Sequence, residues 1–153
     1  MSIADRLAEL GLSIPSVAAP VAAYVPAVVT GRYVHTAGQL PFVDGALSVT
    51  GKVGAGVDPE TAAAEARTAV LNALAAVQSV AGSLDRVARV VKVTVFVASD
   101  PSFTGQPAVA NGASTLVGEV FGDAGVHARS AVGVAVLPLD APVEVELVVE
   151  LTD

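Results

Sequence analysis

Alternating apolar and polar residues predict a half-buried strand near the C-terminus, over residues 143–151. Valine or leucine stands at every odd position of this segment, whereas Glu144, Glu146 and Glu150 stand at even positions. Successive side chains of a strand point to opposite faces of a sheet, so one face should be apolar and the other acidic. We expect the apolar face to meet helices and the acidic face to meet solvent or a polar cavity.

Four further segments are expected to be strands because β-branched residues dominate them and turn residues bound them. Residues 25–29 and 33–37 flank the turn Thr30-Gly31-Arg32 and should form a hairpin. The apolar run at 87–98 should be a buried strand. The next strand should cover 131–137, before a proline-containing turn.

Two segments between these strands have the start and stop signals of helices. A long helix should begin at Asp58, with Pro59 in its first position, and run to about residue 82. A second should span residues 107–120, with a glycine at its end. The order ββαβαββ predicts an α+β fold in which two helices cover one face of a mixed sheet.

A further short helix should precede this domain. Ser2-Ile3-Ala4-Asp5 is typical of a helix start, and Gly11 of its stop. We therefore divide the chain into an N-terminal docking helix over residues 1–12 and a single domain over residues 13–153.

Charged residues are unusually few in this chain. They make up 15% of its 153 residues, against about 25% in a typical soluble domain, while hydrophobic residues make up 53%. So few charges cannot coat a monomer, and closed homo-oligomers are the commonest way to cover an apolar surface. We therefore expect an obligate oligomer.

Charge and cysteine content exclude several classes of function. Fifteen acidic and eight basic residues give a formal net charge of -7, and the basic residues do not cluster, so nucleic acid is not an expected partner. The absence of cysteine excludes disulfides, thiolate catalysis and Cys-ligated zinc, and it suits a reducing cytoplasm.

One uncharged stretch, residues 10–31, is long enough for a membrane span. Pro15, Pro20 and Pro26 interrupt it, and each removes a backbone donor and restricts the residue before it. The mixed charges ahead of it are unlike the positive start of a signal peptide. We expect a cytoplasmic protein without a membrane segment.

Two possible sites have weak signals. The glycine-rich run 51–56 has neither the dinucleotide-binding nor the Walker spacing, so a plain loop is favoured over phosphate binding. His35 and His127 lack metal-ligand spacing, and no metal site is expected. His35 is most simply a half-buried polar residue, whereas His127 is either a surface loop residue or part of a site with Arg129.

Arg129 is the strongest candidate for ligand binding. It stands at the entrance to an apolar strand, where its planar guanidinium can present a fork to a carboxylate. A structural ion pair with Glu144 or Glu146 is the alternative, and the residues alone slightly favour it.

Several stretches together resemble the RidA/YjgF family of enamine and imine deaminases, also called the endoribonuclease L-PSP family. They occur in the family's order from about residue 20 to residue 151. The matching pieces are Tyr24, Val34-His35-Thr36-Ala37-Gly38-Gln39-Leu40-Pro41, Val91-Lys92-Val93-Thr94-Val95-Phe96-Val97, Asn111, Ala128-Arg129-Ser130-Ala131-Val132, Leu137-Pro138 and Val143-Glu144-Val145-Glu146.

The resemblance implies a fold like the bacillus type of chorismate mutase, assembled as a homotrimer with ligand sites in the clefts between subunits. It implies that Arg129 binds the substrate carboxylate and that Glu144 positions or activates water. It implies a small 2-imino or 2-keto acid as ligand and requires no metal or cofactor. The remaining positions that match the substrate cleft are Tyr24, Ala37, Gly38, Asn111 and Ala131.

This sequence departs from the best-known members of the family within the cleft. Ala131 occupies a position where cysteine is common, Gly133 replaces a frequent glutamate, and Ala37 stands where serine is frequent. These changes enlarge and depolarise the cleft. They indicate a divergent branch with its own N-terminal helix.

The activity implied by the resemblance is hydrolytic deamination of reactive 2-enamino or 2-imino acids, such as 2-aminoacrylate, to 2-keto acids and ammonia. Such a hydrolase is a 2-iminobutanoate/2-iminopropanoate deaminase. The loss of polar groups in the cleft motivates an alternative, a non-catalytic trimeric binding protein for small keto or carboxylic acids. Endoribonuclease activity is disfavoured by the acidic charge and the sparse aromatic residues.

Overall fold

A mixed five-stranded sheet forms the centre of the molecule. The computed structural model describes residues 1–17, 19 and 22–153. The strand order is β1-β2-β9-β7-β8, in which β7 and β8 are parallel and all other neighbours are antiparallel. These strands are β1 (Ala27–Thr30), β2 (Tyr33–Thr36), β7 (Val87–Ala98), β8 (Ala128–Val134) and β9 (Val143–Leu151).

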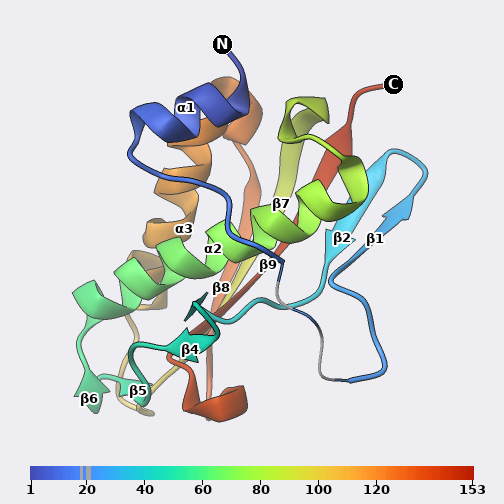
Figure 1. Cartoon of the computed structure of the whole chain (residues 1–153). Helices are drawn as coiled ribbons and strands as arrows, with labels where there is room; N and C mark the ends of the chain where they lie inside the picture. The colour runs from blue at the N-terminus through green and yellow to red at the C-terminus, as the bar shows by residue number, and fades with distance from the viewer. Residues whose placement is uncertain (18, 20–21) are drawn as a thin grey trace.

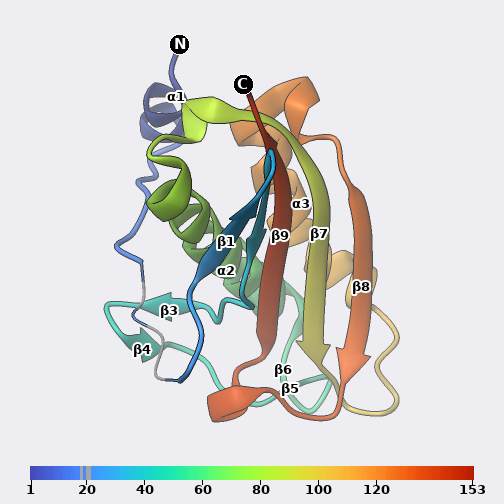
Figure 2. The same ribbon diagram turned by 90° about the vertical axis from the view of Figure 1, so that its right-hand side faces the viewer.

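Two helices cover one face of this sheet. They are α2 (Pro59–Ala81) and α3 (Gln106–Phe121); in Figure 1, α2 crosses in front of the strands and α3 lies to their left. Figure 2 shows the sheet from its other side, with the helices behind and no described helix or strand in front. The predicted ββαβαββ order and the two-layer α+β arrangement are thus confirmed.

The apolar core lies between the sheet and the helices. Every odd position of β9, from Val143 to Leu151, is at least 96% buried, whereas the even positions are only partly covered. Val93, Val95 and Val97 of β7 are fully buried on the same face. The expectation that the apolar face of this strand meets the helices is therefore confirmed.

The structure confirms the start and stop residues that predicted α2. The Asp58 side chain accepts a hydrogen bond of 2.8 Å from the backbone N–H of Thr61, and Pro59 occupies the first turn. Gly82 follows the helix with a φ of 83°, a left-handed conformation that glycine adopts without a steric penalty. The helix therefore spans Pro59–Ala81, within one residue of its expected end.

The N-terminal helix α1 (Ile3–Glu9) packs over one end of the helical layer. Ser2 and Asp5 form a capping box, and Leu7 is 98% buried against the core. The backbone N–H of Ile3 donates to Asp85 at 2.7 Å, and Arg6 Nε donates to the carbonyl oxygen of Glu119 at 2.7 Å. The helix is thus fixed by one buried leucine and two long-range hydrogen bonds.

The boundaries of two strands differ from those expected. β8 runs over 128–134 rather than 131–137, because its parallel ladder begins where Lys92 pairs with Ala128 and ends where Ala98 pairs with Val134. β1 begins at Ala27 rather than 25, directly after Pro26, which has no backbone N–H. The predicted hairpin is confirmed, but Thr30 belongs to β1 and pairs with Tyr33, so the turn itself consists of Gly31 and Arg32.

The segment between β2 and α2 contains short strands that the sequence pattern did not predict. They pair locally, β3 with β4 and β5 with β6, and the glycines mark turns as expected. The glycine-rich run thus forms a small β structure, and Lys52 within it pairs with Asp140. The strands are β3 (Phe42–Val43), β4 (Ala46–Leu47), β5 (Lys52–Val53) and β6 (Gly56–Val57).

The described residues include no helix with the length and apolar character needed to cross a membrane. Of the prolines that interrupt the uncharged N-terminal stretch, Pro15 and Pro26 are described, and Pro20 lies outside the described residues.

The two helices of the layer are in close contact at Gly112. A Cβ atom on this residue would lie 1.9 Å from the carbonyl oxygen of Ala63 in α2. About two turns further along α3, Glu119 accepts a hydrogen bond of 3.0 Å from Arg67 of α2. The absence of a side chain at position 112 therefore sets the spacing of the helical layer.

Replacing Gly112 with alanine is predicted to destabilise the protein by about 1–3 kcal/mol, because α2 and α3 must move apart to admit the methyl group. Gly118→Ala is the matched control: no heavy atom lies within 4 Å of its added Cβ, and the better helix propensity should stabilise by up to about 1 kcal/mol. Urea unfolding at fixed protein concentration measures both. Equal effects of the same sign would contradict the close contact.

Candidate functional site

Arg129 lies on the helix-covered face of the sheet, at the edge strand β8. Its parallel partner in the ladder is Val93, which points into the core beneath the helices. Arg129 Nη1 donates to Asn111 Oδ1 at 2.7 Å and to Ser114 Oγ at 3.2 Å, and both acceptors are on α3. One end of the guanidinium is thus held by the helix.

The other end of the guanidinium has no partner in the described part of the chain. No described carboxylate lies within 4.0 Å of Arg129, and its Nε and Nη2 atoms donate to none of the described residues. Within the described residues of one chain, Arg129 therefore forms no ion pair with Glu144 or Glu146, contrary to the alternative interpretation. The held arginine keeps its full charge and still has donors for a ligand.

A hydrogen-bonded chain extends from Arg129 to His127. Ser114 Oγ lies 2.9 Å from His127 Nε2, and His127 Nδ1 lies 2.6 Å from the carbonyl oxygen of Gly125. Of the two alternatives for His127, the structure thus favours a place beside Arg129. Sequence reasoning missed Ser114, although its spacing of three residues from Asn111 on a helix was a usable signal.

Glu144 lies on the opposite, uncovered face of the sheet. It belongs to the even positions of β9, and its neighbour in β7 is Phe96. A Cβ atom on Gly38 would lie 1.9 Å from Glu144 Oε1, so the carboxylate rests directly against the backbone of this glycine. The structure therefore brings Gly38 and Glu144 together, as the resemblance implied.

The protonation of Glu144 is perturbed by its surroundings. Burial raises the pKa of this carboxyl above its ordinary value, and the negative charge of Glu146 raises it further. Within the described residues, Glu144 makes no hydrogen bond or ion pair that would oppose this effect. A raised pKa makes this carboxylate a stronger base than an ordinary glutamate, which favours a role in proton transfer.

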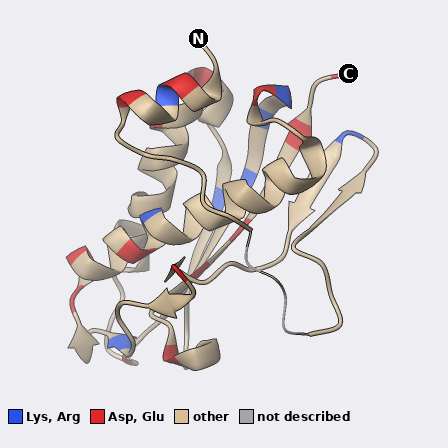
Figure 3. Cartoon of the chain, viewed as in Figure 1, with Lys and Arg blue, Asp and Glu red and all other residues tan. Residues whose placement is uncertain are grey.

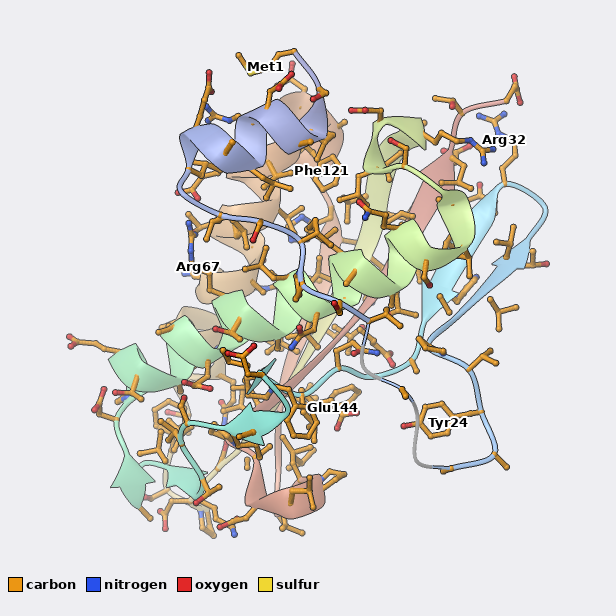
Figure 4. All side chains as sticks on the ribbon, in the orientation of Figure 1. Met1, Tyr24, Arg32, Arg67, Phe121 and Glu144 are labelled. Carbon is orange, nitrogen blue, oxygen red and sulfur yellow. The ribbon has the colours of Figure 1, made fainter. Side chains whose placement is uncertain are left out.

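The other candidate residues either lie away from Arg129 and Glu144 or are alanines without a polar side chain. Ala131 shares the face of Arg129 and packs against the core. Ala37 is half-buried, and its N–H donates to Pro26 at 2.7 Å. Tyr24 is 53% exposed, and Figure 4 shows it on the connecting loop, away from Glu144.

Within one chain the candidate residues form two separate groups. We call Arg129, Asn111, Ser114 and His127 the arginine half-site, and Glu144 with Gly38 the glutamate half-site. The half-sites lie on opposite faces of the sheet and on strands two apart, which is about 10 Å of lateral separation alone. One small ligand therefore cannot contact both half-sites of the same chain.

The remaining charged residues do not form a second candidate centre. Figure 3 shows basic segments scattered over several elements. Among the described residues, no group of three or more His, Asp or Glu side chains is arranged to hold a metal ion. His35, expected to be half-buried, is exposed because the face it lies on is uncovered.

The mixed sheet with two helices on one face, and with arginine and glutamate half-sites at its edge and centre, defines a chorismate mutase-like α+β domain. A family model confirms this class over nearly the whole chain. The chain belongs to the family described as "YjgF/chorismate mutase-like, putative endoribonuclease", whose model matches residues 4–151.

Individual relatives match over similar lengths. Protein TCP17 of Trypanosoma cruzi is 48% identical over 152 residues, which cover 99% of this chain and 95% of that protein. The structure of Atu1372 from Agrobacterium tumefaciens, a protein of unknown function, is 43% identical, with a TM-score of 0.91 and coverage of 99% and 94%. Escherichia coli TdcF with bound serine is 25% identical, with a TM-score of 0.65 and coverage of 92% and 96%.

Replacing Glu144 with glutamine is predicted to raise the melting temperature of the ligand-free protein at pH 7. A folded-state pKa above the unfolded value means that the folded chain binds the proton more tightly, so stability falls as pH rises between the two values. The gain should vanish at about pH 3.5, below the ordinary glutamate pKa.

Glu150→Gln is the control for this experiment. Glu150 lies on the same face of β9 but is 3.3 Å from Arg32, so its replacement should not stabilise the protein. A gain at Glu144 that is equally large at pH 3.5 and pH 7 would refute the electrostatic origin.

Proposed function

We propose that this protein hydrolyses reactive 2-enamino and 2-imino acids, such as 2-aminoacrylate, to 2-keto acids and ammonia. The observation that carries the proposal is Arg129, which α3 holds at one end while its other donors remain unpaired among the described residues. A guanidinium in this state is suited to bind a carboxylate through two parallel hydrogen bonds. The serine bound in TdcF also has a carboxylate next to a nitrogen-bearing carbon.

The complete site is proposed to form between subunits of a homotrimer. Arg129 of one chain would face Glu144 of the next, because the two half-sites of a single chain lie on opposite faces of its sheet. The uncovered face also exposes apolar side chains that an assembly would bury. By register with β9 these include Val28, Tyr33 and Val132, exposed by 53%, 43% and 44%.

The proposed chemistry is a water addition followed by loss of ammonia. The enamine gains a proton at C3 and loses one from its nitrogen to become the imine, whose C2 is electrophilic, while Arg129 holds the carboxylate in place. Glu144 accepts a proton from water as its oxygen bonds to C2. That proton passes to the nitrogen, which has received the electron pair of the C=N bond, and the product is a carbinolamine. The new hydroxyl then gives its proton, by way of Glu144, to the nitrogen. The C=O bond forms as the C–N bond breaks, and ammonia and the 2-keto acid leave. The raised pKa of Glu144 suits a group that both accepts and returns this proton.

A binding protein without turnover is the second candidate. The observation that favours it is the small apolar character of the strand beside Arg129, where Ala131 and Gly133 share its face. A Cβ on Gly133 would lie 2.8 Å from Gln106 Nε2, so the amide of Gln106 fills the space where a longer side chain would lie. Such a site would hold a short keto or carboxylic acid through Arg129 alone.

Arg129→Ala is predicted to reduce kcat/KM on the order of 100-fold, because the substrate carboxylate loses its charged partner. The assay generates 2-aminoacrylate with a pyridoxal-phosphate enzyme and follows pyruvate release. Arg129→Lys should keep the charge but lose the fork, giving an intermediate rate. Arg32→Ala, which removes an arginine from the exposed β1–β2 turn, should have no effect.

The two candidate functions give different results in the same series. If pyruvate release is no faster with the wild-type protein than without it, the deaminase proposal is abandoned. Binding of 2-ketobutyrate by the wild type but not by Arg129→Ala would then support the binding protein. RNA cleavage that survives Arg129→Ala and falls with further purification would mark a contaminant.

Mixed oligomers are predicted to recover activity from two inactive variants. Arg129→Ala and Glu144→Gln, co-refolded in equal amounts, should assemble sites in which each chain supplies the residue the other lacks. With random mixing, about a quarter of the sites would be complete. If each chain contained its own complete site, mixing would recover nothing, and that result would reject the shared site.

A further inference from the structure

When His127 is neutral, the hydrogen bonds that hold Arg129 from behind have one consistent direction. The carbonyl oxygen of Gly125 can only accept, so His127 Nδ1, 2.6 Å away, must bear the proton. Neutral His127 then has a bare Nε2 that accepts the hydroxyl proton of Ser114 at 2.9 Å. Because the Ser114 hydroxyl proton points to His127, Ser114 Oγ accepts a hydrogen bond of 3.2 Å from Arg129 Nη1.

We propose that His127 is a positioning residue that acts through Ser114 to orient Arg129 for its ligand. The proposal rests on the proposed function in so far as that ligand is a small carboxylate. Without an acceptor at His127, the hydroxyl of Ser114 is free to rotate, and Nη1 keeps only Asn111 as a fixed partner. The guanidinium can then rotate about that single contact, so its remaining N–H donors no longer have a fixed orientation toward the ligand.

We call the chain of hydrogen bonds from Gly125 through His127 and Ser114 to Arg129 the relay. The two partners of His127 in it, the Gly125 carbonyl and the Ser114 hydroxyl, lie in adjoining elements of the fold. Gly125 is buried at the end of the short 3-10 helix that follows α3, and a Cβ there would lie 2.5 Å from the carbonyl oxygen of Val117. Ser114 lies on α3 itself. Because α3 fixes the Gly125 carbonyl and the Ser114 hydroxyl together, His127 has one orientation in which it satisfies both.

Two substitutions at His127 separate a relay from a merely structural role. In His127→Gln, the side-chain amide reaches the place of Nε2, and its oxygen can accept from Ser114. In His127→Asn, the shorter amide reaches the place of Nδ1, so it can donate to Gly125 but cannot accept from Ser114. The relay requires the hydrogen bond from Ser114 to residue 127. A merely structural role of His127 requires only the hydrogen bond to the Gly125 carbonyl.

The first test is the dissociation constant for 2-ketobutyrate, measured by calorimetry on the intact protein. Ser114→Ala and His127→Asn should each weaken binding by roughly threefold to tenfold, and combining them should add little. His127→Gln should stay within about twofold of the wild type. Thr115→Ala, at the exposed neighbour of Ser114 on α3, is the control and should have no effect.

In turnover assays the same variants should raise KM and leave kcat within about twofold, because carboxylate binding is common to the substrate and the transition state. If His127→Asn binds as the wild type does and His127→Gln does not, the relay is overturned. A fall in kcat at unchanged KM would also reject it.

A second measurement needs no ligand, so it separates failure of the relay from failure of the proposed function. The chain has only two histidines, and removing His35 assigns the signals of His127 in long-range proton–nitrogen spectra. At pH 8, His127 should be the Nδ1–H tautomer, and Ser114→Ala should shift its Nε2 resonance. An Nε2–H tautomer would overturn the relay, whereas absence of 2-ketobutyrate binding beside a correct tautomer would count only against the proposed function.

Discussion

The chemical difference between the two faces of β9 is the constraint on which the rest of the structure depends. β9 lies between β2 and β7, so its apolar face, once buried beneath the helices, decides which side chains of its neighbours point inward. Leu147 of β9 pairs with Val93 of β7, and Val93 pairs with Arg129 at the sheet edge, so all three side chains lie on the same face. A slip of one residue would put Ser130 against α3 and send Arg129 to the other face. The arginine half-site therefore depends on a hydrophobic pattern two strands away.

The same constraint separates the arginine and glutamate half-sites. Glu144 alternates with buried valines, so it must point away from the helices that hold Arg129. Nothing in a single described chain covers that open face, and the chain has few charges with which to solvate it. The low charge content and the divided site thus favour the same arrangement, in which a second copy covers the open face and completes the site.

The sequence pattern predicted the elements whose signals are local. The helix at Pro59–Ala81 and the strands at Val87–Ala98 and Val143–Leu151 have caps, turns or alternation that act within a few residues. It did not place β8 correctly, because the ends of a parallel strand depend on the partner strand, and the apolar residues at 135–137 resemble those within it. The short strands near Lys52 were missed because two-residue pairs leave no period to detect.

For the site, the resemblance made Arg129 and Glu144 candidates, and the contact of Gly38 with Glu144 agrees with it. What no linear pattern could show is that they occupy opposite faces, since that follows from the register of three strands. Ser114 was missed for a related reason. Its role appears only when α3 crosses β8, and the one local signal was its spacing of three residues from Asn111, which places both side chains on one face of the helix.

The identity of the groups that hold Arg129 bears on what the site can bind. A carboxylate partner would orient the guanidinium equally well, but it would also neutralise the charge that attracts an anion. The amide of Asn111 and the hydroxyl of Ser114 orient the same group through neutral acceptors. His127 extends this arrangement, because its tautomer directs the serine proton away from the arginine without adding a negative charge. An arginine held in this way is positioned and remains fully charged, which is the combination that recognition of a small carboxylate requires.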